Sequence, residues 1–566
     1  MALSSSSSAS SGADQYPMDN DYEWLHGRVD AGIDENLNLV EAVPVQMPET
    51  EELQQRNLLN GSRAGTPLSK GLPSAYSLPG MLELNRRLAR LGLGEVSKST
   101  SLAIPGPAIT EPAKPSFLLA LPSELIDTIL SYLSPIDLVG TSTTCRLLSS
   151  HSRGDLVWQR HVQDNVPGVR LTSPFPCKTY RELYITHDPH WFLTKYKVWF
   201  CDYFLTGKII LTRYDPRRGC IEGYQLIAER EPPTFDPWEV DDEVLIHSFN
   251  PKCRLHKDMP VLQLDALSLE SLMNSSSKRH ENRFHAEIPM RINEPNVSGV
   301  FSNFSLTVPV NPHPSMQLWP PSTIPARHRV RNASSEGFMG IGHKPQKRSQ
   351  VSNQAFRIRR WMEMGATSAS PGLHLGEEVY TYATLDPKLY TPTEEKPFRG
   401  IWVGDYSGHG CEFLLMNQPD NETPFDEASV VRAEDETVEE WEARKKDERI
   451  YRGSLEAIKL TGDPNVPRGE YTFISDDISK TGFVRTATES RFKGARIVKS
   501  RGHIAARMFR NDKYIESQLI MVSHDRLAQY WVGFGHISFY ERVNIDTFLN
   551  PANDPLPKPP APAASA

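Results

Sequence analysis

The chain has 566 residues, enough for two or three domains, and a formal net charge of −8 at pH 7. Its lysines and arginines are scattered, so the sequence lacks the basic stripe typical of nucleic-acid binding. No run of about 18 apolar residues is present to span a membrane, and the N-terminus lacks the features of a signal peptide. The six cysteines stand far apart without a CxxC pair, which favours reduced thiols in the cytoplasm or nucleus.

The hydrophobic content predicts a sizeable core accompanied by disordered stretches. Hydrophobic residues make up 39% of the chain, which contains 45 prolines and has a mean hydropathy of −0.45. Residues 1–115 are rich in serine, proline, glycine and acidic groups, and we expect them to be disordered. Within them Met81–Leu93 has helical spacing, which fits either a docking helix for a partner or a transient helix.

The segment 118–162 predicts three short helices that carry more apolar residues than so small a unit can bury. Pro122 suits the first position of a helix, and Leu125 and Ile129 follow at helical spacing. Ser134-Pro135 ends this helix and offers an N-cap for the next one, while Trp158 closes the unit. A unit below about 70 residues rarely holds itself together without a staple or a partner. We therefore expect part of its apolar surface to contact another protein.

Four signals in this segment agree in order and spacing: Leu-Pro-x-Glu-Leu from 121, Ser-Pro-x-Asp-Leu from 134, Cys-Arg at 145 and Trp at 158. The segment closely resembles an F-box, which implies docking on the Skp adaptor and through it on a cullin ubiquitin ligase. The alternative is a plain helical subdomain inside a larger core. The predicted adaptor-binding residues are Leu121, Pro122, Leu125, Ile126, Ile129, Leu133, Pro135 and Leu138.

From residue 196 the sequence changes to short runs of β-branched and aromatic residues separated by turn signals. Many short antiparallel strands without long helices between them indicate a barrel or a sandwich, and a barrel would leave no edge strands. Twelve strands are predicted: 198–205, 208–214, 222–228, 379–385, 400–406, 412–416, 455–461, 471–474, 497–499, 518–522, 528–534 and 537–543.

Two insertions are expected to interrupt this domain. The first, at about 270–350, has six prolines between Pro309 and Pro325 and is predicted to be flexible. The second, 419–450, is acidic and then helical over 438–449, which fits a solvated surface helix better than a site for basic clients. The predicted class is α+β, with disordered 1–115, an F-box at 116–162, a helical linker at 163–195, a mainly antiparallel β-barrel domain at 196–546 and a disordered proline-rich tail at 547–566.

Three segments of the β region carry a second resemblance: RGIWVGDYSGHGCEFLLM at 399–416, AIKLTGDPNVP at 457–467 and LAQYWVGFGHISFYERV at 527–543. They resemble the cyclin-D-binding domain of the F-box only protein thirty-one family. With the F-box, the resemblance spans roughly 118–250 and 375–545, and residues 251–375 match poorly. It implies a β-barrel substrate domain that accepts the extended C-terminal end of a client protein.

The residues of these segments are compatible with a peptide site. Glycines at 404, 408 and 410 flank a loop where backbone can approach a peptide closely, and a second turn follows at 461–464. Loops at a barrel mouth commonly form a ligand cleft, and hydroxyls and backbone donors can hold a peptide terminus. The alternative is that these motifs only shape hairpins. The predicted substrate-binding residues are Tyr406, Ser407, His409, Thr461, Asp463, Pro464 and Trp531.

The sequence predicts no cofactor and no metal site. Vertebrate relatives in the family place two Cys and two His as zinc ligands in this domain, whereas here the comparable stretch offers His247, Cys253 and His256. A structural zinc normally needs four ligands.

We expect a non-catalytic receptor. Asp405, Ser407 and His409 stand close together, but positions two apart on a strand share one face, whereas a triad needs groups oriented from different elements. The predicted function is substrate recognition in an SCF-type (Skp-cullin-F-box) ubiquitin ligase, leading to client ubiquitination and proteasomal degradation. The partners would be the Skp adaptor, the cullin scaffold and a client protein. Two alternatives remain: an F-box scaffold that acts without the cullin, and a lipocalin-like small-molecule binder.

Overall fold

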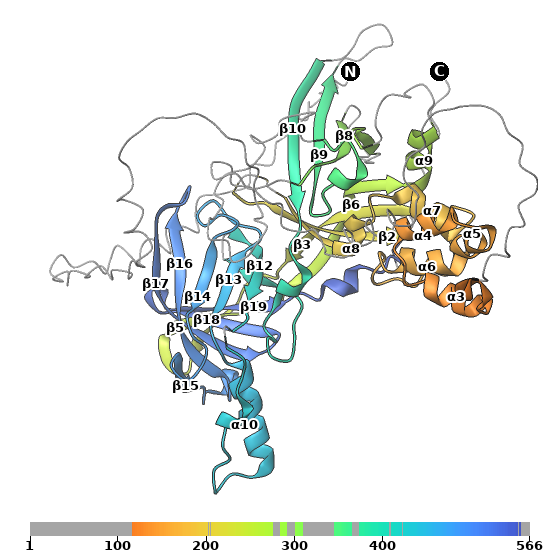
Figure 1. Cartoon of the computed structure of the whole chain (residues 1–566). Coiled ribbons are helices and arrows are strands. Elements are labelled where there is room, and N and C mark those ends of the chain that lie inside the picture. The colour runs from red at the N-terminus through yellow and green to blue at the C-terminus, as the bar shows by residue number, and fades with distance from the viewer. Residues whose placement is uncertain are drawn as a thin grey trace, which may run out of the picture. The chain divides into compact units, whose positions relative to one another are not determined.

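Figure 1 shows the chain as a computed structural model. It describes residues 116–555, with gaps at 202, 204, 275–283, 291–299, 310–343, 365–372, 407–408, 422 and 553. The predicted disorder of 1–115, the helix at 81–93, most of the first insertion and the end of the tail lie outside the described residues. Among the helices that are described, none has the length and apolar character needed to cross a membrane.

The helical module predicted at 118–162 is confirmed. It consists of a 3-10 turn and four short helices, one more than the three predicted, and Ser134 and Cys145 cap the second and third. Ser134 Oγ accepts a hydrogen bond from Asp137 N at 3.2 Å, as the Ser-Pro pattern predicts. Cys145 Sγ likewise accepts a hydrogen bond from Leu148 N at 3.5 Å. The elements are the turn Phe117–Ala120, α3 (Ser123–Leu130), α4 (Pro135–Ser142), α5 (Arg146–Ser152) and α6 (Asp155–Gln163).

The chain then forms an open antiparallel sheet. Two helices, α7 (Tyr180–His187) and α8 (Phe192–Tyr196), lead from the module into it, and α9 (Ala266–Asn274) follows one of its strands. Its order is β6-β3-β2-β1-β10-β9-β8-β7. The strands are β1 (Val198–Cys201), β2 (Lys208–Asp215), β3 (Cys220–Glu229), β6 (Lys252–Asp265), β7 (Ile288–Met290), β8 (Val300–Leu306), β9 (Ala355–Met364) and β10 (Leu373–Ala383).

The predicted barrel is confirmed and lies in the C-terminal part of the described chain. Eight antiparallel strands follow one another in sequence, and the first pairs with the last in the register Trp402↔Arg542, which closes the sheet. A closed sheet leaves no exposed edge among these strands. They are β11 (Gly400–Asp405), β12 (Cys411–Asn417), β13 (Leu455–Lys459), β14 (Tyr471–Ser475), β16 (Arg496–Ala506), β17 (Arg510–Ser523), β18 (Arg526–Trp531) and β19 (His536–Arg542).

Three further strands and one helix are attached to the barrel. β15 (Phe483–Thr486) pairs with β16, while β5 (Asp241–His247) joins β19 in parallel and carries β4 (Phe235–Trp238) at its edge. The helix α10 (Val438–Ile450) confirms the predicted helix and begins with a capping box between Thr437 and Glu440. Short 3-10 turns cover 348–350, 387–389, 427–429, 490–492, 532–534 and 545–548.

The open sheet shares one core with the helical module and another with the barrel. Strand β1 shows this alternation: Trp199 packs with Ile126, Leu138 and other apolar residues of the module. Its neighbour Phe200 packs with Ile401 and other residues on the outside of the barrel. Because successive residues of a strand point to opposite faces, a strand covered on both faces must be apolar throughout. This explains the unbroken sequence Val-Trp-Phe-Cys of β1.

Candidate functional site

The first candidate site is the exposed face of the helical module. On α3, Leu125 and Ile129 are 49% and 42% exposed, and their spacing of four residues places them on one side of the helix. Among the other predicted adaptor-binding residues, Pro122 is exposed and Leu121, Leu133 and Pro135 are half-buried. Ile126 and Leu138 are buried and contribute to the shared core instead of the surface. The face therefore presents only part of the predicted set.

Sequence reasoning missed several exposed apolar side chains beside this face. They could have been found in the sequence as apolar residues at helix positions that lie off the apolar stripe and therefore face solvent. Tyr132, at the end of α3, is 76% exposed and lies under the guanidinium of Arg160, 5.3 Å from its ring centroid. The remaining exposed apolar residues of the module are Phe117, Leu118, Leu119, Ile136, Val139, Leu147 and Leu156. We call Leu125, Ile129, Tyr132, Ile136 and Val139 the apolar face.

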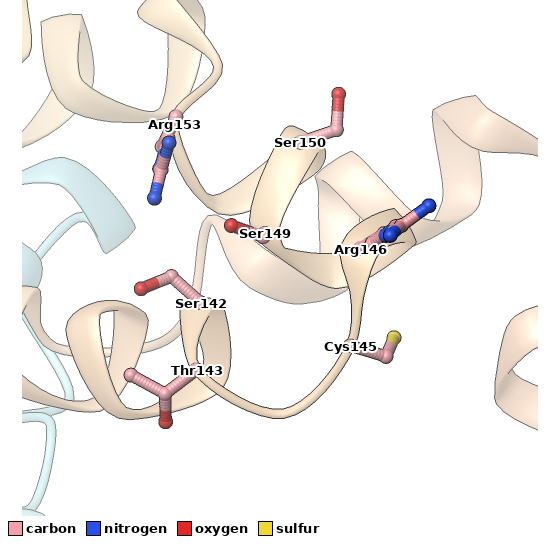
Figure 2. Close-up of a pocket in the computed structure, with 7 residues that line it drawn as sticks. All are labelled: Ser142, Thr143, Cys145, Arg146, Ser149, Ser150 and Arg153. Carbon is pink, nitrogen blue, oxygen red and sulfur yellow. The ribbon is translucent and has the colours of Figure 1, made fainter.

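A shallow cavity of about 660 Å³ lies between the end of α4 and α5 (Figure 2). Hydroxyls and two guanidinium groups surround it, and Figure 2 shows the side chains of Ser142, Ser149 and Arg153 extending toward the space between the two helices. The lining residues are Ser142, Thr143, Cys145, Arg146, Ser149, Ser150 and Arg153. This polar hollow gives the module a second kind of surface beside its apolar face.

The second candidate site is one end of the barrel, where the loop after β11 meets the loop after β13. Lys459, the last residue of β13, holds the two loops together. Its Nζ lies 2.6 Å from Asp463 Oδ2 and 2.7 Å from Glu412 Oε2. It also lies 4.1 Å from the centroid of the Tyr406 ring. The two loops that the sequence predicts to contain client-binding residues therefore share one buried cation.

The protonation of this cluster follows from burial and from the single positive charge. Burial raises the pKa of Glu412 well above its usual value, more than Lys459 lowers it. Burial alone would also raise the pKa of Asp463, but the charge of Lys459 and hydrogen bonds from Glu412 and Lys459 lower it to about 2. The two shifts have opposite directions: burial favours the neutral form of Glu412, and Lys459 favours the ionised form of Asp463.

The strand register shows that this end of the barrel interior is polar. Apolar side chains from all eight barrel strands fill the rest of the interior, among them Trp402, Leu414 and Leu519. Toward the β11–β12 loop they give way to Tyr540, whose hydroxyl donates to Gln529 Oε1 at 2.7 Å. Tyr406 Oη lies 2.7 Å from Thr472 Oγ1. The apolar interior thus ends in a layer of buried hydroxyl, amide and charged groups, and we call this end of the barrel the polar mouth.

The structure brings the described members of the predicted client set to this one mouth. Asp463 also accepts hydrogen bonds from the backbone N–H groups of Asn465 and Val466 at 2.6 and 2.7 Å, and Thr461 Oγ1 accepts from Phe413 N at 2.9 Å. These two polar groups therefore shape the loop as well as facing the mouth. His409 is exposed, Tyr406 and Pro464 are half-buried, and Ser407 lies outside the described residues.

Trp531 belongs to the same end of the barrel. It is the last residue of β18, and its indole N–H donates to Ser538 Oγ at 3.0 Å. Its ring covers Gly502 of β16, where a Cβ would collide with the ring atoms. Sequence reasoning missed Lys459 and Glu412. The available signal was a charged residue at an inward position of a strand that is otherwise apolar.

Two of the residues that the sequence analysis weighed for a hydrolytic or a metal site, Asp405 and His247, have other partners in the structure. Asp405 lies 3.0 Å from the guanidinium of Arg230, and this ion pair ties β11 to the segment after β3. Within the described chain, no three His, Cys, Asp or Glu side chains are grouped closely enough to hold a metal ion. His247 instead stacks on His536, with ring centroids 4.9 Å apart. Burial lowers the pKa of these two imidazoles, to about 4 and about 3.

Comparison with known domain families gives a match for each of the two regions that contain the candidate sites. Residues 118–164 match the F-box-like family, and these residues form the helical module with the apolar face. Residues 382–547 match the Cyclin D1 binding domain, and this range contains the whole closed barrel. The chain therefore joins a region similar to F-box-like domains to a region similar to cyclin D1 binding domains.

A curated relative matches a shorter part of the chain. It is Protein EXECUTER 2, chloroplastic, from Arabidopsis thaliana, which is 24% identical over 179 residues. The match covers 31% of this chain, and the chain spans about a quarter (24%) of the length of that relative.

Proposed function

We propose that this protein is the substrate-recognition subunit of an SCF-type ubiquitin ligase. In this proposal the apolar face docks on the Skp adaptor, and the adaptor links the chain to a cullin scaffold. The observation that carries the proposal is that Leu125, Ile129, Tyr132, Ile136 and Val139 stay exposed although the module already shares a core with the open sheet. The sheet covers only part of the apolar surface of the module, so the remaining apolar surface is available to a second protein.

We infer that the client lies at the polar mouth of the barrel. Exposed His409 and half-buried Tyr406 and Pro464 surround the buried Lys459 cluster, and a client C-terminal peptide would meet hydroxyl and backbone groups there. Holding the client beside a ubiquitin-charged enzyme raises the effective concentration of its lysines, and modification would mark it for proteasomal degradation. Such a protein would work in the cytoplasm or nucleus.

The barrel interior bears on the small-molecule alternative. A lipocalin-like carrier needs an open apolar cavity, whereas the described interior is packed with buried side chains such as Trp402, Phe473 and Tyr540. This packing supports a receptor that binds at its surface. A scaffold that acts without the cullin remains distinguishable by experiment, because it would bind the adaptor and leave its client unmodified.

The test is co-expression of the full chain with the Skp adaptor, and then with the cullin. Leu125→Ala with Ile129→Ala removes two side chains that are each about half exposed, so covering them contributes about 1 kcal/mol each. The double variant should bind the adaptor about 30-fold more weakly in a titration by interferometry. The matched control is Leu267→Ala with Val431→Ala, which truncates exposed apolar residues outside the module. Equal binding by both double variants would contradict the proposal.

A further inference from the structure

A basic cleft of about 330 Å³ lies where the last described residues of the chain cross the open sheet. Arg213 of β2 and Arg254 and Lys257 of β6 line one side of it. Asn550 and Asp554, which follow the barrel in sequence, line the other side. We call Asn550–Pro555 the C-terminal strap.

The strap is held by its acidic residue. Arg213 is a buried guanidinium, 4% exposed, whose Nε donates to Glu222 Oε1 at 2.8 Å and whose Nη1 donates to the Phe548 carbonyl at 3.0 Å. Its remaining nitrogen, Nη2, pairs with one carboxylate oxygen of Asp554, and Lys257 pairs with the other. Asp554 is 13% exposed, and its backbone carbonyl accepts a hydrogen bond from Arg217 at 2.7 Å.

The sheet side of the cleft needs one negative charge. Four carboxylates of the sheet stand near five cations, and the pairs among them leave one positive charge without compensation until Asp554 arrives. Without Asp554, Arg213 keeps Glu222 as its anionic partner, whereas Lys257 loses the carboxylate with which it pairs. The cations are Arg213, Arg217, Arg218, Arg254 and Lys257, and the carboxylates are Asp215, Glu222, Glu229 and Asp258.

We propose that this cleft is a docking site for an acidic segment of another protein, and that the C-terminal strap occupies it in the free chain. The strap shows the required chemistry: one carboxylate clamped by two cations, with a backbone carbonyl held by a third. Lys257 is 45% exposed, so one ammonium group beside Asp554 stays open to solvent; Arg254, 50% exposed, is paired with Glu229. A longer acidic segment would meet these groups as well. The inference does not depend on the proposed ligase role.

Competition between strap and partner sets the size of the effect. A segment tethered by a short linker has an effective concentration of about 1 mM at its site. If the strap sequence alone binds the vacant cleft with a Kd of about 0.1 mM, the tethered strap weakens the apparent affinity of any competing peptide about tenfold. Releasing the strap should therefore raise the affinity for an added acidic peptide by about that factor.

The experiment uses the full chain and two fluorescent peptides. One peptide has the sequence of residues 548–558 with Lys558→Gln and blocked ends, so that its single aspartate gives it a net charge of −1, and the other has the same composition in scrambled order. Asp554→Asn in the full chain should bind both peptides about tenfold more tightly than the unmodified chain does, measured by anisotropy. Adding Lys257→Gln should abolish this binding. Lys252→Gln is the matched control, because Lys252 lies on the same strand but pairs with Glu231 outside the cleft.

A second variant is needed because the strap of Asp554→Asn can stay in the cleft through its other contacts. A chain ending at Leu549 lacks the strap, and it should bind both peptides at least as tightly as Asp554→Asn does. Absence of saturable binding to both variants, each shown to be folded by circular dichroism, would overturn the proposal. Binding of the 548–558 peptide without the scrambled one would also overturn it, because the strap would then be a structural tie specific to its own sequence.

Discussion

The buried cluster at Lys459 predicts a large loss of stability for one single substitution and a small loss for another. Lys459 is 2% exposed and holds two carboxyl groups within 2.7 Å. Lys459→Met would leave ionised Asp463 buried without its cation, and breaking a buried ion pair from one side costs about 3 to 5 kcal/mol. Glu412→Gln replaces a carboxyl group whose pKa is raised by burial, which favours its neutral form. It should cost less than about 1 kcal/mol, since the amide resembles the neutral acid in shape.

The pH dependence gives the same pair of variants a second, independent readout. A carboxyl group whose folded pKa is raised stabilises the fold below its unfolded pKa of 4.5, and this contribution is lost as the pH rises. Glutamine does not titrate, so the stability of Glu412→Gln relative to the unmodified chain should increase from pH 5 to pH 8. Asp463 has the opposite sign, because its lowered pKa of about 2 stabilises the fold above 3.8.

Thermal unfolding at three pH values is the assay. A loss of about 3 to 5 kcal/mol corresponds to a fall in Tm of roughly 6 to 20 °C in a domain of about 150 to 250 residues. Lys459→Met combined with Asp463→Asn should recover much of this loss, because Asn keeps an acceptor for the loop N–H groups and leaves no buried charge. An equal fall in Tm for Glu412→Gln and Lys459→Met would refute the assignment of the proton to Glu412.

Three further outcomes follow from the barrel. His536 has a pKa lowered to about 3, so it stabilises the fold above pH 6.5, and this contribution is lost as the pH falls. The unmodified chain should therefore lose about 2 kcal/mol more stability between pH 7.5 and pH 5 than His536→Phe does, measured by urea unfolding. Gly502→Val should lower Tm by several degrees, because its side chain would collide with Trp531; an unchanged Tm would contradict the close packing. His409→Ala should weaken client capture in a pull-down and leave adaptor binding unchanged, whereas unaltered capture would place the client elsewhere.

Local sequence pattern was sufficient for the helical module and for most barrel strands. The Ser134-Pro135 cap and the strand predicted at 412–416 both reappear in the structure, the latter as β12. Pattern failed for β6 and β9, which the sequence did not predict as strands. Strand β9 carries three arginines in ten residues, and Arg359 is compensated by Glu287, 72 positions away. Charges paired across such distances make a strand resemble a loop when only its neighbours in sequence are considered.

The candidate sites were also predictable only where local sequence pattern marks them, and not where they depend on contacts between distant residues. The loops containing Tyr406 and Asp463 are marked by glycine and proline, so the sequence indicates where they begin and end. Lys459 joins them only because two strands bring an inward lysine beneath both loops. The contact of Arg213 with Asp554 spans 341 positions, and no local pattern anticipates it.

The open sheet explains why the helical module has more apolar residues than its own size requires. Part of this excess, including Ile126 and Leu138, packs on one face of the sheet with Trp199. The other face of β1 packs through Phe200 on the barrel. A receptor that merely tethered its client would need only a flexible linker between the adaptor contact and the barrel. Two shared cores on one sheet give a stiffer connection, which in the proposed ligase role would limit the client lysines that can approach a bound ubiquitin-charged enzyme.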